Sequence, residues 1–229
     1  MSAPARTFLA RVGCVGLARV PGREFSFGVG TVPRVTSDRP ELWLVRHGET
    51  EWSAAGRHTS RTDLDLTEDG RTHASALRER LAGVDFARVL SSPRLRAQQT
   101  AKLAGFGHRI ELLDDLTEWD YGDDEGRTSA EIQTERPGWT VWDDGPAGGE
   151  TATDVRRRAD HVITVARAEV GPVLAFTHGH FARVLGARWI GLEVAGGAHL
   201  LLSTASVCVL GAERDVAALR LWNDTSHIH

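Results

Sequence analysis

Residues 41–52, ELWLVRHGETEW, place a short apolar run directly before an arginine, His47 and a glycine. Four of the first five residues are apolar, and a run of this length bounded by polar residues predicts a buried strand over residues 42–45. Residues 172–180, PVLAFTHGH, repeat the pattern, because a second apolar run ends in His178 and a glycine. If the two strands are adjacent and parallel, both imidazoles lie at one edge of a sheet and share one pocket.

From about residue 40 onward, short apolar runs alternate with helical patterns. Further strands are expected at 87–92 (ARVLSS), 110–116 (IELLDDL), 205–212 (ASVCVLGA) and 216–223 (VAALRLWN). Helices are expected at 67–83, 93–105, 128–136, 152–171 and 181–192. Strands that are apolar on both faces and alternate with helices predict an α/β fold with three layers, in which helices cover both faces of a mostly parallel sheet.

The helical segments carry signals for where they begin and which face they bury. Thr67 suits an N-cap, and Pro93 suits the first turn of the next helix. In the segment 152–171, helical spacing relates the apolar residues Val155, Ala159, Val162 and Ala166. The three consecutive arginines, Arg156–Arg158, are therefore expected on the exposed face of that helix.

The first part of the chain differs from the rest. Residues 1–38 contain scattered glycine, proline and arginine and no sustained periodicity. We therefore expect a poorly ordered N-terminal extension at 1–38 and one folded domain at 39–229. A misassigned start codon is the alternative explanation of this extension.

Composition and charge restrict the partners and the compartment. The chain has 229 residues and a net charge of −4, so no basic field is expected to attract nucleic acid or an anionic membrane surface. No apolar run approaches the roughly 18 residues that a membrane span needs. Cys14 and Cys208 form no CxxC pair, which disfavours a disulfide framework and predicts a reducing cytoplasm. The oligomeric state stays open, with a homodimer among the alternatives.

Several motifs occur in an order typical of one family. They are RHGETEW at 46–52, GR at 56–57, SSPRLRAQQTA at 91–101, LTEWDYG at 116–122, GGET at 148–151 and THGH at 177–180. In this order they resemble the histidine phosphatase superfamily, which includes phosphoglycerate mutases and many phosphatases. The spellings EWDYG and THGHF are most similar to its acid phosphatase and sedoheptulose-bisphosphatase-like branches. The resemblance implies a phosphoglycerate mutase-like fold and hydrolysis of phosphomonoesters of small metabolites.

The resemblance also implies roles for the residues at the strand ends. His47 is expected to attack phosphorus and to become phosphohistidine. Glu118 is expected to protonate the leaving oxygen and then to take a proton from the attacking water. His178 is expected to complete the phosphate site and to stabilise the transition state. Gly48 and Gly179 are expected to let the backbone approach the phosphate oxygens.

Arginines are expected to bind the phosphate, since one guanidinium donates two parallel hydrogen bonds to an oxyanion. The resemblance implies this role for Arg46, Arg96 and Arg57. Ser53 stands where many members have asparagine and could donate only through its hydroxyl. His180 is expected to contact the substrate or to orient the neighbouring histidine.

Other readings of the same residues remain open. Arg46 and Arg96 could form ion pairs with Glu49 or Asp115, and Glu118 could be a helix cap. His178 and His180 form an HxH pair, but no third metal ligand is evident, so neither a metal nor a cofactor is expected.

Two other activities also remain open. The acidic residues 123–125 are expected to repel the carboxylated substrate of a cofactor-dependent phosphoglycerate mutase, and phosphatase is therefore favoured. A non-catalytic module that binds a phosphorylated ligand is the alternative from another class.

Overall fold

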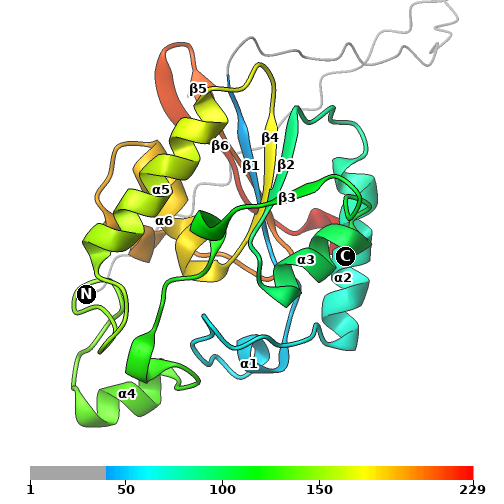
Figure 1. The fold of residues 1–229 in the computed structure, drawn as a ribbon. Coiled ribbons are helices and arrows are strands. Elements are labelled where there is room, and N and C mark those ends of the chain that lie inside the picture. The colour runs from blue at the N-terminus through cyan, green and yellow to red at the C-terminus, as the bar shows by residue number, and fades with distance from the viewer. Residues whose placement is uncertain (1–39, 229) are drawn as a thin grey trace, which may run out of the picture. The chain divides into compact units, whose positions relative to one another are not determined.

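A computed structural model describes residues 40–228, so the extension predicted at residues 1–38 lies outside the described residues. The framework is a six-stranded sheet with the order β3-β2-β4-β1-β5-β6 (Figure 1). The strands are β1 (Leu42–Arg46), β2 (Arg88–Ser91), β3 (Ile110–Leu112), β4 (Val173–Thr177), β5 (Val207–Glu213) and β6 (Val216–Asp224). The first four strands pair in parallel, whereas β5 is antiparallel to both of its neighbours. The predicted mostly parallel sheet is confirmed.

Helices cover both faces of this sheet (Figure 1). They are α2 (Glu68–Leu81), α3 (Leu95–Leu103), α5 (Ala152–Arg167) and α6 (Gly179–Trp189). Buried residues of α5 and α6 belong to one hydrophobic cluster, and those of α2 and α3 belong to another. In β4, Val173 and Ala175 join the first cluster and Leu174 and Phe176 the second, because side chains alternate across a strand. The predicted three-layer fold is confirmed.

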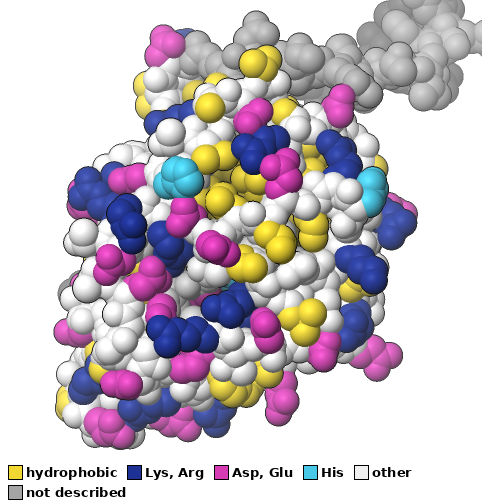
Figure 2. Space-filling model, in the orientation of Figure 1, with side chains coloured by type: hydrophobic (Ala, Val, Ile, Leu, Met, Phe, Trp, Pro, Cys, Tyr) yellow, Lys and Arg dark blue, Asp and Glu magenta, His cyan; other side chains and the backbone are white. Residues whose placement is uncertain are grey.

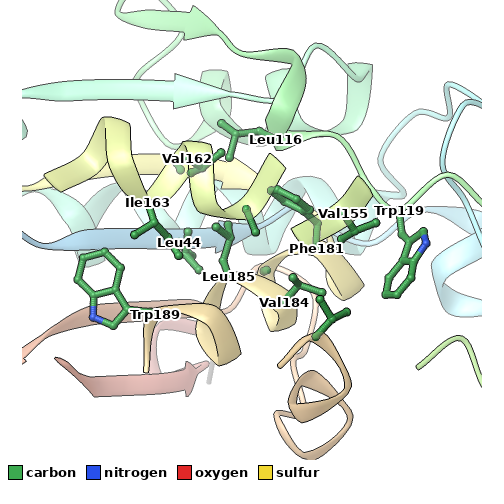
Figure 3. Packing of buried hydrophobic residues seen from close by; sticks show 14 of the residues in the cluster. Leu44, Leu116, Trp119, Val155, Val162, Ile163, Phe181, Val184, Leu185 and Trp189 are labelled. Carbon is green, nitrogen blue, oxygen red and sulfur yellow. The ribbon is translucent and has the colours of Figure 1, made fainter. Parts of the chain in front are cut away.

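The larger cluster lies between α5, α6 and the sheet. Figure 3 shows Val155 and Val162 of α5 close to Phe181 of α6 and Leu44 of β1. All four residues of the apolar stripe predicted for α5 are fully buried. Fully buried aliphatic and aromatic side chains contribute roughly 1.5–3 kcal/mol each. This layer therefore fixes α6, and with it the loop residues that precede the helix, on the sheet.

Short elements complete the described residues. They are α1 (Glu51–Ala54), α4 (Ser129–Glu135), η1 (Asp114–Leu116), η2 (Gly122–Asp124), η3 (Val194–His199) and η4 (Ser226–Ile228). Both α1 and α4 lie beyond the carboxyl end of β1 (Figure 1). The predicted N-cap of α2 is confirmed, because the Thr67 hydroxyl accepts the Gly70 N–H at 3.0 Å. Thr50, Thr128 and Thr151 form capping boxes on α1, α4 and α5, so side chains fix where these helices begin.

One helix begins later than the sequence predicts. Pro93 lies before α3, which begins at Leu95, and Arg94 takes the N-cap position in an extended conformation. The Ser92 hydroxyl accepts the Arg94 backbone N–H at 3.2 Å and lies 2.8 Å from His178 Nε2. This turn is therefore held against the end of β4, and the helix starts after it.

Charges of both signs are interspersed on the face of the molecule in Figure 2. Lysine or arginine side chains lie beside aspartate or glutamate over most of this face. Nucleic acid binding uses a surface with an excess of positive charge, and this face does not present one. That nucleic acid is no partner of the whole protein stays a prediction.

Candidate active site

The register of β1 against β4 brings the two histidines of the repeated pattern together. Arg46 pairs with Thr177 across these strands, so His47 and His178 leave the sheet side by side. Their ring centroids are 5.2 Å apart, and both side chains are buried. The predicted meeting of the two imidazoles at one edge of the sheet is confirmed.

The contacts of His47 define which ring nitrogen is free. Nδ1 lies 2.7 Å from the Gly48 carbonyl oxygen, and since a carbonyl can only accept, Nδ1 carries the proton. Burial lowers the pKa of His47 well below 6.5, and the charges of Arg96 and Arg46 lower it further. The imidazole is therefore neutral, with an unprotonated Nε2 that is able to attack an electrophile.

His178 has the opposite tautomer. Arg96 Nε donates to His178 Nδ1 at 3.2 Å, so the proton of the neutral ring is on Nε2, which donates to the Ser92 hydroxyl at 2.8 Å. Burial first, and then the charge of Arg96, lowers the pKa of His178 well below 6.5. His178 is therefore a neutral hydrogen-bond donor whose orientation is set from both sides.

Arg46 is a half-buried cation, and not all of its N–H donors bind protein groups. Its Nη1 donates to the Leu202 carbonyl at 2.6 Å, while its buried Nε has no hydrogen-bond partner. Burial lowers the pKa of Arg46, and the charge of Glu118 opposes this shift. Gly179 lies against the guanidinium, because a Cβ there would be 3.3 Å from Nε. Since Arg46 lines the pocket described below, its guanidinium is able to bind an anionic ligand there.

The guanidinium of Arg96, unlike that of Arg46, donates hydrogen bonds to other groups of the protein from each of its nitrogen atoms. Besides His178, its guanidinium donates to the carbonyls of Thr62 and Thr59 at 3.0 Å and of Ser60 at 3.3 Å. It is fully buried and does not line the pocket described below. The contacts are therefore to His178 and to the loop of residues 59–62, not to Glu49 or Asp115, and direct phosphate binding by Arg96 stays a prediction.

The side chain of Glu118 lies at the first turn of α6, and it lines the same pocket as His47 and Arg46. Its Oε1 accepts the backbone N–H of Trp119 at 2.9 Å and of Phe181 at 2.8 Å, and Oε2 accepts that of His180 at 3.0 Å. Glu118 is buried, with 7% of the residue exposed. Glu118 thus caps α6, as one alternative reading held, and also borders the pocket.

Arg57 and Ser53 lie at the rim of the same pocket. The Arg57 side chain is 40% exposed, donates to the Gly126 carbonyl and lies 3.5 Å from the Glu131 carboxylate. The Ser53 hydroxyl completes the capping box with Thr50. Both residues are therefore held by protein contacts, and their predicted contacts to phosphate stay predictions.

Ring side chains form the opposite wall. His180 Nδ1 and the Tyr121 hydroxyl share a hydrogen bond of 2.5 Å. The ring of His58 is tilted by 40° against that of Tyr121, with 4.6 Å between the ring centroids. Burial lowers the pKa of both His180 and His58, so this wall is uncharged. The sequence singled out His180 but not His58 or Tyr121, because neither ends a predicted strand.

The pocket has a volume of about 210 Å³. Its walls are formed by Arg46, His47, Ser53, Gly56, Arg57, His58, Thr59, Glu118, Tyr121, Ser129, Gly179, His180, Arg183 and Leu202. Pockets for drug-sized ligands typically measure roughly 300–1,000 Å³. The space therefore suits a phosphate with a small organic group.

The acidic segment does not border this pocket. Asp124 is buried and accepts hydrogen bonds from Arg136 at 2.5 Å, and the Glu125 carboxylate accepts the Ser60 backbone N–H. Asp123 lies against Gly148. These side chains therefore do not line the pocket, and the expectation that they repel a carboxylated substrate stays a prediction.

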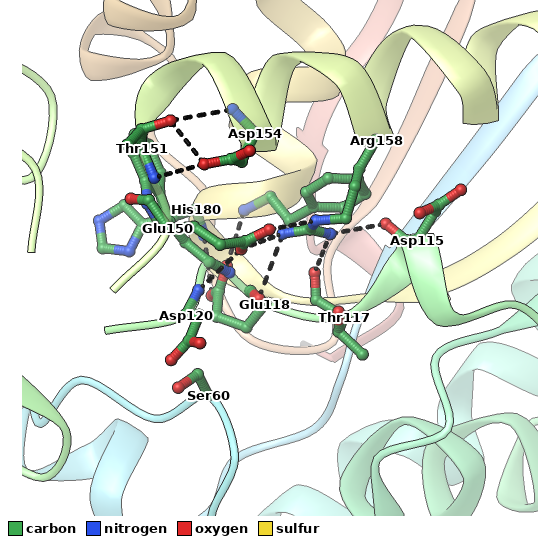
Figure 4. A network of polar contacts seen from close by, with 12 residues as sticks. Ser60, Asp115, Thr117, Glu118, Asp120, Glu150, Thr151, Asp154, Arg158 and His180 are labelled. Carbon is green, nitrogen blue, oxygen red and sulfur yellow. Dashed lines mark hydrogen bonds and ion pairs between the residues drawn. The ribbon is translucent and has the colours of Figure 1, made fainter. Parts of the chain in front are cut away.

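Arg158 is the residue that the sequence misplaced. It is 8% exposed, not on the solvent face of α5, and its guanidinium forms two bonds of 2.7 Å to Glu150 (Figure 4). Helical spacing gives the reason, since position 158 follows Val155 by three residues and precedes Val162 by four. That spacing was the available signal, and the run of three arginines obscured it.

Two further features concern ligands and membranes. Within residues 40–228, no group of three or more His, Cys, Asp or Glu residues is arranged to hold a metal ion. Over the same described residues, no helix is both long and apolar enough to cross a membrane. The HxH pair is accounted for by the contacts of His178 and His180 given above.

The model of the histidine phosphatase superfamily (branch 1) matches residues 42–225. The chain belongs to this superfamily. An acid phosphatase of Mycobacterium tuberculosis is 40% identical over 81% of this chain and 93% of its own length. Sedoheptulose 1,7-bisphosphatase of Saccharomyces cerevisiae is 35% identical over 68% of this chain and 69% of its own length.

The fold of this histidine phosphatase has solved counterparts. The structure of an open reading frame from Mycobacterium tuberculosis superimposes with a TM-score of 0.78 at 39% sequence identity. The superposition covers 80% of this chain and 97% of that one. The predicted phosphoglycerate mutase-like fold is confirmed.

Proposed function

We propose that this histidine phosphatase hydrolyses phosphomonoesters of small metabolites through a phosphohistidine on His47. The observation that carries the proposal is the free Nε2 of a buried, neutral imidazole beside an arginine that lines the same pocket. Relatives that are named phosphatases support the same reaction class, phosphoric monoester hydrolysis.

The first step transfers the phosphoryl group to the enzyme. His47 Nε2 attacks phosphorus, the bond between phosphorus and the ester oxygen breaks, and Glu118 gives its proton to that oxygen. The alcohol leaves, and Glu118 becomes a carboxylate. The close approach of Glu118 to the pocket, and its contacts to the first turn of α6, support this role.

The second step returns the enzyme to its starting state. A water molecule attacks phosphorus of the phosphohistidine, the P–N bond breaks, and the Glu118 carboxylate takes a proton from the water. Inorganic phosphate leaves, His47 is again neutral with a free Nε2, and Glu118 again carries a proton.

Arginine supplies the positive charge that the transferring phosphoryl group needs. Arg46 lines the pocket, and Arg57 lies at the rim. His178 is neutral in the absence of phosphate, and its ring is held beside that of His47 by Arg96 at Nδ1 and by Ser92 at Nε2.

The decisive experiment measures phosphate release and traps the intermediate. We expect the protein to hydrolyse 4-nitrophenyl phosphate, and rapid quenching during turnover should yield a phosphoryl adduct on His47. His47→Ala should lose both signals, while Arg157→Gln, an exposed arginine on α5, should retain them. A phosphorylated ligand that binds without any release of phosphate would instead favour the non-catalytic binding module.

A second assay separates the phosphatase from the mutase. Because the acidic segment does not line the pocket, the choice rests mainly on relatives that are named phosphatases. We expect 3-phosphoglycerate, with or without bisphosphoglycerate, to lose phosphate or to remain unchanged. Sustained isomerisation without phosphate release would reverse the assignment.

The remaining expectations concern cofactor, compartment and assembly. Phosphoryl transfer to His47 requires no metal, so we expect phosphatase activity to survive dialysis against EDTA. A measured loss of activity that Mg²⁺ restores would contradict this. The cytoplasmic location and the homodimer also stay predictions.

A further inference from the structure

The proton donor of the proposed reaction lies in a segment that one partly buried ion pair holds in place. Arg158 of α5 and Glu150, which precedes α5, meet with Nε–Oε1 and Nη2–Oε2 distances of 2.7 Å (Figure 4). Neither residue lines the pocket that contains His47. Their contacts are instead to the residues on both sides of Glu118.

Arg158 holds the segment before and at Glu118 through carbonyl groups. Its Nη1 donates to the carbonyls of Asp115 at 2.8 Å and Thr117 at 3.0 Å, and its Nη2 lies 3.4 Å from that of Glu118. With the two bonds to Glu150, all five N–H donors of the guanidinium are used. A lysine at this position has three donors and lacks the planar geometry, so it cannot replace these contacts.

Glu150 holds the segment after Glu118. Its Oε2 accepts the backbone N–H of Asp120 at 3.0 Å, and its backbone carbonyl accepts the Trp119 indole N–H at 2.8 Å. The ion pair therefore fixes residues on both sides of the carboxyl group that must reach the leaving oxygen.

Arg158 also contacts the helix that Glu118 caps. Its guanidinium lies 4.4 Å from the ring centroid of Phe181, and the Phe181 backbone N–H donates to Glu118 Oε1 at 2.8 Å. The loop and the first turn of α6 thus share this one cation as a neighbour. Displacing it would alter both surfaces between which the carboxyl group is held.

We propose that Arg158 and Glu150 are positioning residues for proton donation by Glu118. The inference rests on the proposed function, because it presupposes that Glu118 protonates the leaving group. It predicts a defect that depends on the leaving group, since an alkoxide needs a proton to depart and a nitrophenolate does not. A residue that only stabilises the fold would affect all esters alike.

The test compares kcat/KM for 4-nitrophenyl phosphate with kcat/KM for glycerol phosphate. The ratio of the two values does not depend on how much of a variant is folded, so partial unfolding cannot imitate the effect. We expect Arg158→Lys and Glu150→Gln to raise this ratio by about tenfold, and Glu118→Gln to raise it by roughly 10²-fold or more, the usual contribution of a general acid. Arg157→Gln, one residue away and exposed, should leave it unchanged.

Two results would overturn the inference, and they are distinguishable. If Glu118→Gln raises the ratio but Arg158→Lys and Glu150→Gln lower both kcat/KM values in equal proportion, the ion pair does not position the donor, and the proposed function stands. If Glu118→Gln leaves the ratio unchanged, Glu118 is not the donor, and its role in the proposed function fails together with the inference.

Discussion

At the scale of single residues, the site combines neutral imidazoles with buried arginine. Burial is the main reason why the pKa values of His47, His178 and His180 lie well below 6.5, and nearby arginines lower them further. A nucleophilic imidazole needs an unprotonated nitrogen. His47 therefore stays ready to attack in mildly acidic solution, where a free histidine would be charged.

The same shifts predict how stability depends on pH. In the unfolded chain these histidines titrate near 6.5, and in the folded protein they stay neutral to lower pH. Their contribution to the free energy of unfolding is thus complete above about 6.5 and is lost as the pH falls below it, by at most about 1.4 kcal/mol per pH unit for each histidine. Urea unfolding at pH 7.5 and pH 5.5 measures this slope. His180→Gln should reduce it and the exposed His108→Gln should not; equal slopes in both variants would contradict the prediction.

The position of Arg46 in the pocket lining predicts that the protein binds inorganic phosphate. A phosphate bound there would accept hydrogen bonds from the Arg46 guanidinium. Phosphate at 100 times its Kd should add about 2.7 kcal/mol to stability, which corresponds to a rise in Tm of roughly 5–10 °C for a chain of this size. Thermal melts with and without phosphate test this. Arg46→Gln should lose the rise while Arg157→Gln retains it, and an undiminished rise in Arg46→Gln would exclude Arg46 from the phosphate site.

At the scale of elements, the two glycines that follow the histidines have different structural reasons. A Cβ on Gly48 would lie 2.5 Å from the carbonyl oxygen of Gly70 in α2, whereas a Cβ on Gly179 would lie 3.3 Å from the Arg46 guanidinium. The first glycine therefore permits close backbone packing between the end of β1 and the start of α2. Only the second lies directly against a predicted phosphate-binding side chain.

These positions predict opposite phenotypes for the same substitution. Gly48→Ala should lower the free energy of unfolding by about 1–3 kcal/mol, because overpacked backbones must separate. Gly179→Ala should change stability little but lower kcat/KM, because Arg46 has to move. Urea midpoints and phosphatase kinetics distinguish the two, with Gly83→Ala as control, where a Cβ meets nothing within 4 Å. A purely kinetic defect in Gly48→Ala would contradict the packing explanation.

Local sequence patterns predicted most elements but not the loops between them. Apolar runs found the strands, and the stripe at Val155, Ala159, Val162 and Ala166 found the buried face of α5. Arg158 was missed because charged side chains are expected on the surface, although its spacing placed it on that face. The sequence predicted Pro93 in the first turn of α3. The contact between Ser92 and His178 holds the turn before this helix, and a contact between residues so far apart in the chain leaves no local signal.

At the scale of the whole molecule, the site depends on contacts within residues 40–228. The two hydrophobic clusters are formed by residues of β1 through η4. We therefore expect a chain that begins at residue 39 to fold and to retain kcat/KM within about twofold, since about 190 residues suffice for a complete core. Kinetics and thermal melts of the shortened and full-length chains provide the test. A shortened chain that folds but loses activity would show that residues 1–38 contribute to the site.

The sequence predicted part of the site and missed part of it. His47 and His178 were found because equal strand patterns end at one edge of a parallel sheet, which the β1–β4 register confirms. The ring wall of His58 and Tyr121 comes from loops whose shape depends on tertiary contacts, so no periodicity indicated it. The partners of Asp124 and Glu125 also lie elsewhere in the chain, so no local pattern showed that these side chains do not line the pocket.

Glu118 is both a cap for α6 and the proposed acid, and this double use ties the backbone to the catalytic cycle. In the state that carries the proton, the first turn of α6 faces a neutral group. After the alcohol departs, the same amides face a full negative charge. A negative charge at this position stabilises the N-terminus of a helix. Deuterium uptake at the amides of residues 180 and 181 should therefore slow when the phosphoenzyme accumulates, so the peptide backbone itself would report each half of the turnover.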